Sequence, residues 1–218
     1  MTSAAAGLVT SNESKTASIQ AHLNRAIEDL LASLPNPKQL SAEERRGIIA
    51  RYTAVLEGNF IYWMTGAYIA VGSDEARGKI MDNLREEVRD CHPGMMRRFA
   101  IAAQAVPTEA DAQAIYPNLM NVRLFIGRLS PVPIVVTMAF FEGFIQRFMP
   151  YLADLAQRQG SAEMEYTDVH GICDVTHTQE LFNALEAEMA LTPAVPEEEM
   201  FEGVGLLRTL IQNIAVNN

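Results

Sequence analysis

The stretch PVPIVVTMAFFEGFIQRFMPYLADLAQRQ, residues 131–159, decides the fold that we predict. Its first fifteen residues are apolar around the whole helical circumference and carry a single charge, that of Glu142. A helix that is apolar on all sides is buried, either in the core of a protein or in a membrane. The run 131–145 is too short to span a bilayer, and a charge lies within it. We therefore expect this helix at the centre of a helical bundle.

The rest of the chain shows helical periodicity and lacks the alternation of strands. Ser41 followed by Glu44 predicts a capping box at the start of a long helix, and Ser73 and Thr108 are N-cap candidates for two others. This pattern predicts an all-α protein with seven or eight helices in one domain, residues 13–218, after a flexible N-terminal segment, residues 1–12. The expected helices are 13–34, 42–71, 74–92, 95–106, 108–116 with a further piece at 118–128, 131–159, 164–191 and 197–216.

Composition limits the partners and the compartment. The chain of 218 residues has a net charge of −10, and its 17 lysines and arginines form no basic stripe. We therefore expect neither nucleic acid nor a membrane surface as a partner. A secretory signal is not visible, and two cysteines are too few for a disulfide framework. These observations favour a cytoplasmic protein, and homodimerisation through an outer apolar face is compatible with them.

Three candidate metal ligands lie in the segment His170-Gly-Ile-Cys-Asp174-Val-Thr-His177. At about 100° per residue, offsets of four and seven residues place all three on one helical face. Imidazoles suit iron, zinc or copper, whereas a carboxylate suits a harder ion. The alternative is a solvated face with an incidental His/Asp pair. The flanking Tyr166 and Leu181 indicate that this face turns inward.

Glu142 is the second candidate, because it is the only charge in the most apolar segment of the chain. A buried, unpaired carboxylate costs several kcal/mol or takes up a proton instead. A metal cation would compensate it. The alternative is an ion pair with an arginine from a neighbouring helix.

The third candidate segment is Asn83-Leu-Arg-Glu86-Glu87-Val-Arg-Asp-Cys-His92-Pro93. In a regular helix the side chains of Glu87 and His92 would diverge by about 140°. Pro93 cannot donate a backbone hydrogen bond, so a kink or a π-type widening is expected here and would bring the two side chains together. The alternative is a charged helix end with an exposed histidine.

Together these segments supply six potential ligands, enough for two metal ions with open coordination positions. Ligation rich in carboxylate and poor in thiolate favours iron or manganese over structural zinc. Two ferrous ions carry a charge of +4 and three carboxylates −3, and the remaining positive charge favours an anionic substrate or a peroxide. The six predicted metal ligands are Glu87, His92, Glu142, His170, Asp174 and His177.

The order of these residues resembles that of the haem-oxygenase-like di-iron oxidases and oxygenases. These share a seven-helix fold with haem oxygenase, thiaminase-II-type proteins and the pyrroloquinoline-quinone synthase. The spacing of His170, Asp174 and His177 matches the family pattern, and 83–87 resembles its Asn-Leu-x-Asp/Glu-Glu signature. The stretch 52–62 is similar to the first core helix of the thiaminase-II branch. The likeness covers residues 52–180. The interval from Glu87 to His92 is shorter than in these relatives, so Glu86 is an alternative to Glu87.

The resemblance implies a function. It implies two iron ions, dioxygen as co-substrate, and a peroxo-diferric species that attacks a C–H, N–H or C–C bond of a small metabolite. An external electron donor is one option for reducing the iron. Amino acids and fatty acids are among the family's substrates, which suggests a carboxylate-bearing metabolite here. Arginines are candidates to hold that carboxylate: Arg85, Arg89, Arg97, Arg98, Arg123, Arg128 and Arg147.

Some further residues have roles implied by the same resemblance. The helix that carries Glu57 supplies an extra carboxylate ligand in some members, so Glu57 is either a ligand or an acid that lines the pocket. Tyr62, Trp63 and Tyr166 are candidates for pocket walls, radical relays or, as in one branch, the oxidised group. For each of them plain core packing is the alternative.

Three other interpretations stay open at this point. The same polar residues could serve a metal-independent binding protein or a cofactor-independent catalyst as hydrogen-bonding groups. A purely structural bundle would require Glu142 to pair with an arginine. A zinc site that uses the thiolate of Cys173 beside His177 is a third option.

Overall fold

The computed structural model describes residues 2–192 and 194–216, with side chains from residue 14 onward. This part of the chain folds into one domain of eight helices and contains no strand, which confirms the predicted all-α class. The helices are α1 (Thr2–Ala32), α2 (Ala42–Ala70), α3 (Asp74–Arg89), α4 (His92–Ala102), α5 (Glu109–Ile126), α6 (Pro131–Arg158), α7 (Glu165–Met189) and α8 (Glu197–Val216).

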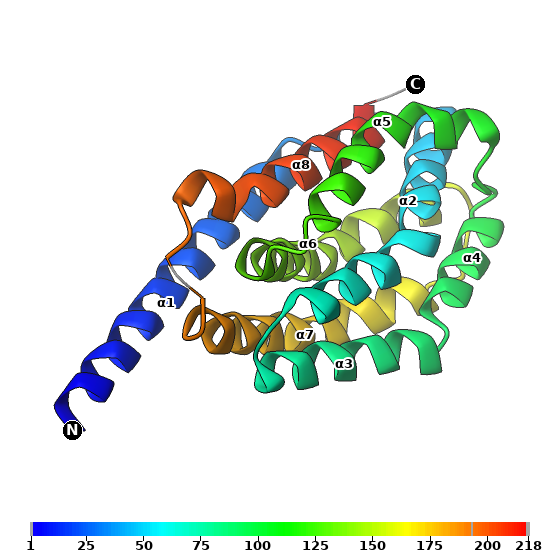
Figure 1. Ribbon diagram of the computed structural model, residues 1–218. Helices are drawn as coiled ribbons and strands as arrows, with labels where there is room; N and C mark the ends of the chain where they lie inside the picture. The colour runs from blue at the N-terminus through cyan, green and yellow to red at the C-terminus, as the bar shows by residue number, and fades with distance from the viewer. Residues whose placement is uncertain (1, 193, 217–218) are drawn as a thin grey trace.

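Helix α6 lies at the centre of the bundle, where the sequence predicted it. It contacts α1, α2, α7 and α8, and Figure 1 shows α7 and α8 on opposite sides of it. Helix α6 is long and apolar enough to cross a membrane, but 89% of its most apolar window is buried inside the protein. It therefore behaves as the core helix of a bundle.

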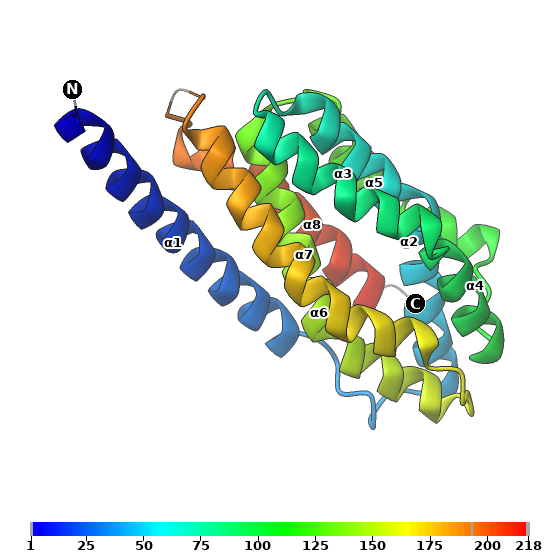
Figure 2. The same ribbon diagram turned by 90° about the horizontal axis from the view of Figure 1, so that it is seen from below.

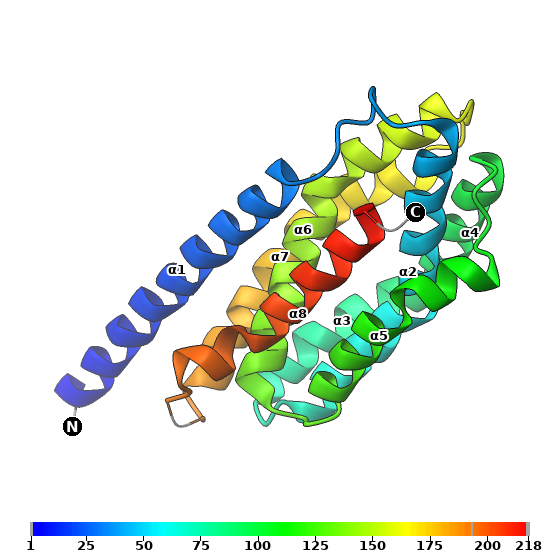
Figure 3. The ribbon, with the colours of Figure 1, turned by 90° about the horizontal axis from the view of Figure 1, so that it is seen from above.

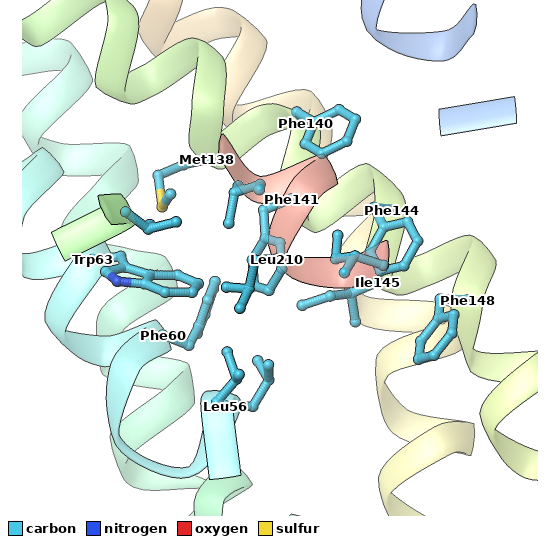
Figure 4. Close-up of a cluster of buried hydrophobic side chains, with 14 of the residues drawn as sticks. Leu56, Phe60, Trp63, Met138, Phe140, Phe141, Phe144, Ile145, Phe148 and Leu210 are labelled. Atoms are coloured by element: carbon cyan, nitrogen blue, oxygen red, sulfur yellow. The ribbon is translucent and has the colours of Figure 1, made fainter. Parts of the chain in front are cut away.

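Aromatic side chains fill the space between α2, α6 and α8 (Figure 4). The rings of Trp63 and Phe141 meet edge to face, with centroids 5.3 Å apart, a favourable geometry for an aromatic pair. On α8, Gly203 permits a close approach, because a Cβ at this position would overlap the side chains of Thr137 and Phe125. This packing fixes the face of α6 that carries Glu142.

Two boundaries differ from the prediction. Helix α1 begins at Thr2, so residues 2–12, expected as a separate segment, form its first turns; a run of three alanines favours helix there. Figures 1 and 3 show this end of α1 extending beyond the other helices. Helix α5 is continuous through Pro117, where we expected two pieces. An interior proline costs a helix about 3 kcal/mol, and the burial of Ile115 and Leu119 on either side of it offsets this cost.

The chain breaks between α3 and α4. We had expected a kink or a π-type widening within one helix, and the structure shows two separate helices instead. Helix α3 ends at Arg89, Cys91 adopts the left-handed conformation (φ 57°, ψ 45°), and α4 begins at His92. Pro93 lies in the first turn of α4, where its missing N–H costs nothing. Helix α3 lies alongside α7 (Figure 2), and the break turns α4 across the end of this pair.

Candidate metal centre

The structure buries all six predicted ligands. Each of them is at most 5% exposed. They come from four helices, because the break at Cys91 puts Glu87 on α3 and His92 on α4. The face of α7 that carries His170, Asp174 and His177 points into the protein, so it is not a solvated face.

A first group of ligands consists of Glu87, His92 and His170. One ligand atom from each lies within 4.8 Å of the others. The Oε1 atom of Glu87 is 2.7 Å from Nδ1 of His92, and the two imidazole rings meet edge to face at 4.5 Å. The turn at Cys91 thus brings together two side chains that a continuous helix would separate.

A second group surrounds His177. Its Nδ1 atom lies 3.7 Å from Oδ1 of Asp174 and 3.8 Å from Oε1 of Glu142. The side-chain amide of Asn83 donates a hydrogen bond of 2.7 Å to the same oxygen of Glu142. The thiol of Cys173 donates to Asp174 at 3.1 Å and lies within 4.8 Å of both ligand atoms, so a thiolate ligand stays geometrically open.

Both glutamates of the Glu86-Glu87 pair lie at the site, but they contact different histidines. Glu87 is buried in the first group. Glu86 is 44% exposed at the side chain, and its Oε2 atom lies 2.9 Å from Nε2 of His177. The geometry therefore favours Glu87 as the ligand.

The site holds three buried carboxylates, and no lysine or arginine in the described part of the chain pairs with them. Within the described residues, the ion-pair partners of Glu87, Glu142 and Asp174 are histidines alone. The arginine at Glu142 that the structural interpretation requires is not found among the described residues. The charge of these carboxylates must therefore be balanced by protons on the site or by a bound cation.

The protonation of the site reflects this imbalance. Burial and the nearby Asp174 raise the pKa of Glu142 well above its usual range. Burial opposes a charge on His177, but the carboxylates of Asp174 and Glu142 outweigh it and raise its pKa to about 10. Protons on these groups supply the positive charge that a metal ion would otherwise bring.

Two of the buried ligand atoms lack a hydrogen-bond partner, which is compatible with a cation at this place. Oδ2 of Asp174 and Nδ1 of His177 are buried and make no hydrogen bond, and such atoms are costly unless something binds them. Nδ1 of His170 lies 2.8 Å from the backbone oxygen of Tyr166. If Nδ1–H donates this bond, Nε2 is free, as in most metal-ligating histidines. These groups could hold a metal ion.

A small cavity opens beside the first group. The space open to the centre of a water-sized sphere is about 20 Å³, enough for one or two water molecules. Glu57 lines it too, but its carboxylate pairs with Arg97 of α4 and makes no contact with the six ligands. The other lining residues are Leu56, Phe60, Ile61, Glu87, His92, Pro93, Met96, Glu142, Ile145, Tyr166 and His170.

Of the three aromatic candidates, only Tyr166 lies at the site. Its ring centroid is 4.2 Å from that of His170, and its hydroxyl is 3.1 Å from the hydroxyl of Tyr52. Tyr62 is 46% exposed and lies under the guanidinium of Arg123, away from the cavity. The reason is periodicity, because two residues after the cavity-lining Phe60 a helix has turned by about 200°. Trp63 is a core residue.

Two residues of the site were not assigned a role from the sequence. Asn83 precedes Glu87 by four residues, so both lie on one face of α3. That spacing was the signal for its contact with Glu142. Tyr52 gave no comparable signal, since its hydrogen bond to Tyr166 joins residues 114 apart.

Comparison with known proteins identifies no relative. No protein-family model matches the chain, and neither a curated protein nor a solved structure is significantly similar to it. The likeness to haem-oxygenase-like oxidases thus stays a prediction from sequence motifs.

Proposed function

We propose that this chain is a cytoplasmic non-haem di-iron enzyme that uses dioxygen to oxidise a small, carboxylate-bearing metabolite. One observation carries the proposal. Three buried carboxylates and three buried histidines from four helices converge, and no lysine or arginine of the described residues pairs with these carboxylates. Such a donor set, rich in oxygen and poor in sulfur, suits iron or manganese.

The arrangement of the ligands supports two ions. Glu87, His92 and His170 form one position, and Asp174 and His177 form another. Glu142 belongs to both, because it lines the cavity with the first group and lies 3.8 Å from His177 in the second. If two ions bind, Glu142 would help to hold them, as inward-facing glutamates do in di-iron bundles.

The protein's own groups position the ligands and exclude water. The amide of Asn83 holds one oxygen of Glu142, and the backbone oxygen of Tyr166 orients His170. Apolar side chains, among them Leu56, Phe60 and Ile145, form part of the cavity wall. They limit the water beside the ligands, which strengthens electrostatic interactions there. Bound ferrous iron would supply the electrons with which dioxygen is activated.

The substrate must open the cavity before it can bind. A volume of about 20 Å³ admits a molecule of the size of dioxygen or water but not an amino acid or a fatty acid. The ion pair between Glu57 of α2 and Arg97 of α4 spans the two helices that form this wall. Arg97 does not itself line the cavity, but its partner Glu57 does, so Arg97 is one candidate to accept a substrate carboxylate.

Iron loading under anaerobic conditions tests the proposal. We expect wild-type protein to bind about two ferrous ions per chain, as a di-iron site requires, and His170→Ala and His177→Ala to bind fewer while circular dichroism shows an unchanged helix content. His22→Ala is the matched control, because His22 stacks on Phe201 away from the site.

Oxygen is then admitted with a panel of amino acids and fatty acids. The expected result is a transient visible absorption in wild-type protein and an oxidised product from one class of substrate. A wild-type protein that binds no iron would favour the metal-independent interpretation instead.

A further inference from the structure

The two nitrogen atoms of His177 face different environments. Nδ1 is buried, lacks a hydrogen bond and faces the carboxylates of Asp174 and Glu142. Nε2 faces the other way and lies 2.9 Å from Oε2 of Glu86. A neutral imidazole carries its proton on one nitrogen and its lone pair on the other. The acceptor at one nitrogen therefore decides which nitrogen can bind a metal ion.

We infer that Glu86 is a positioning residue that accepts the Nε2 proton of His177 and so directs the Nδ1 lone pair toward the second metal position. The inference rests on the proposed metal site. A carboxylate that fixes a metal-bound histidine in this way also raises the basicity of the imidazole. Glu86 would thus act through His177 without touching the metal.

The geometry argues against Glu86 as a ligand itself. A cation between Asp174 and Glu142 lies on the Nδ1 side of the ring, whereas Glu86 contacts the Nε2 side. Glu86 is also half-exposed, unlike the six buried ligands.

The adjacent glutamates on α3 acquire different tasks from helix geometry. Consecutive side chains point about 100° apart. Glu87 therefore faces His92 and the interior, while Glu86 faces the edge of α7 and reaches His177. His170 is oriented by a different group, the backbone oxygen of Tyr166. A substitution of Glu86 should therefore change metal binding at the second position alone.

The test uses zinc as a diamagnetic probe in full-length protein. Titration is followed by metal analysis, and nitrogen-15 spectra show which nitrogen of His177 is coordinated. We expect wild-type protein to bind two equivalents, with Nδ1 of His177 coordinated and Nε2 protonated. Removal of an outer-shell carboxylate typically lowers metal affinity about 10- to 100-fold, so Glu86→Ala should weaken the second equivalent by this factor and leave the first unchanged. In the spectrum of Glu86→Ala, the signal of the Nε2 proton of His177 should no longer have the chemical shift of a hydrogen-bonded proton.

Two variants complete the design. Glu86→Gln keeps a carbonyl oxygen that can accept the Nε2 proton, so it should retain most of the affinity that Glu86→Ala loses. Glu75→Ala removes an exposed carboxylate near the start of α3 and should bind both equivalents as wild-type protein does. Equal second-site affinity in Glu86→Ala and Glu75→Ala, or coordination of His177 through Nε2, would overturn the role of Glu86 alone. A wild-type protein that binds no zinc would overturn the metal site as well.

Discussion

Replacing Glu142 by glutamine should stabilise the metal-free protein, although this residue is a proposed ligand. Its side chain is 1% exposed, has no arginine partner among the described residues and has a pKa well above the usual range because of burial and Asp174. Glutamine has nearly the same shape, and its carbonyl oxygen can still accept the hydrogen bond from Asn83. The substitution removes a buried acid without leaving a cavity.

The magnitude follows from proton linkage. Because the pKa is higher in the folded state than in the unfolded state, the wild-type protein loses stability as pH rises above the unfolded value of about 4.3. At pH 7 the unfolded chain has lost this proton. Keeping Glu142 protonated in the folded state therefore costs at most about 3.7 kcal/mol, at about 1.4 kcal/mol for each pH unit between 4.3 and 7. The positive charge on His177 offsets part of this cost, so we expect Glu142→Gln to raise the unfolding free energy by about 1–3 kcal/mol. This corresponds to an increase in Tm of about 2–12 °C for a chain of this size.

Urea denaturation of metal-free protein at pH 7 and pH 5 measures this difference. The gain should shrink at pH 5, where the wild-type carboxyl binds its proton at little cost. Glu188→Gln is the matched control, because Glu188 is equally buried but accepts hydrogen bonds from the backbone amides of Gly72 and Ser73. The Glu188→Gln protein should be less stable than wild-type protein. With metal ions present the order of wild-type and Glu142→Gln protein should reverse. A Glu142→Gln protein that is less stable than wild type without metal, at both pH values, would refute the reasoning.

Three further predictions concern packing, capping and the tyrosine pair. Gly203→Ala should lower the unfolding free energy by about 1–3 kcal/mol, because its Cβ would overlap Thr137; Gly205→Ala, which meets open space, should be neutral or stabilising in the same denaturation assay. Ser41→Ala removes the capping box of α2 and should cost about 1 kcal/mol in thermal unfolding. Tyr166→Phe leaves the buried hydroxyl of Tyr52 without its partner and should cost about 1–3 kcal/mol in urea denaturation.

The sequence was sufficient to predict the class of fold, because its signals are local. The all-apolar circumference of residues 131–145 predicted a central helix, and the Ser41/Glu44 and Thr108 signals marked helix starts that the structure confirms. The spacing of His170, Asp174 and His177 likewise predicted one shared face, which the structure shows to be buried.

Other features depended on tertiary contacts and backbone conformation. The left-handed Cys91 has no distinct sequence signal, so the helix break that joins Glu87 to His92 was expected as a kink. The contact between Glu86 and His177 joins residues 91 apart, and no local pattern encodes it. Helical periodicity alone indicated that Tyr62 faces away from the cavity, as the structure shows. We predicted it as a pocket residue because it lies in the stretch 52–62 that resembles the thiaminase-II branch.

Crystals grown with ferrous iron and measured by anomalous scattering at the iron edge test the central claim most directly. We predict two peaks inside the bundle, one among Glu87, His92 and His170 and the other beside Asp174 and His177, with Glu142 between them. Density without an iron peak at these residues, with Glu142 bonded to Asn83 alone, would contradict the account.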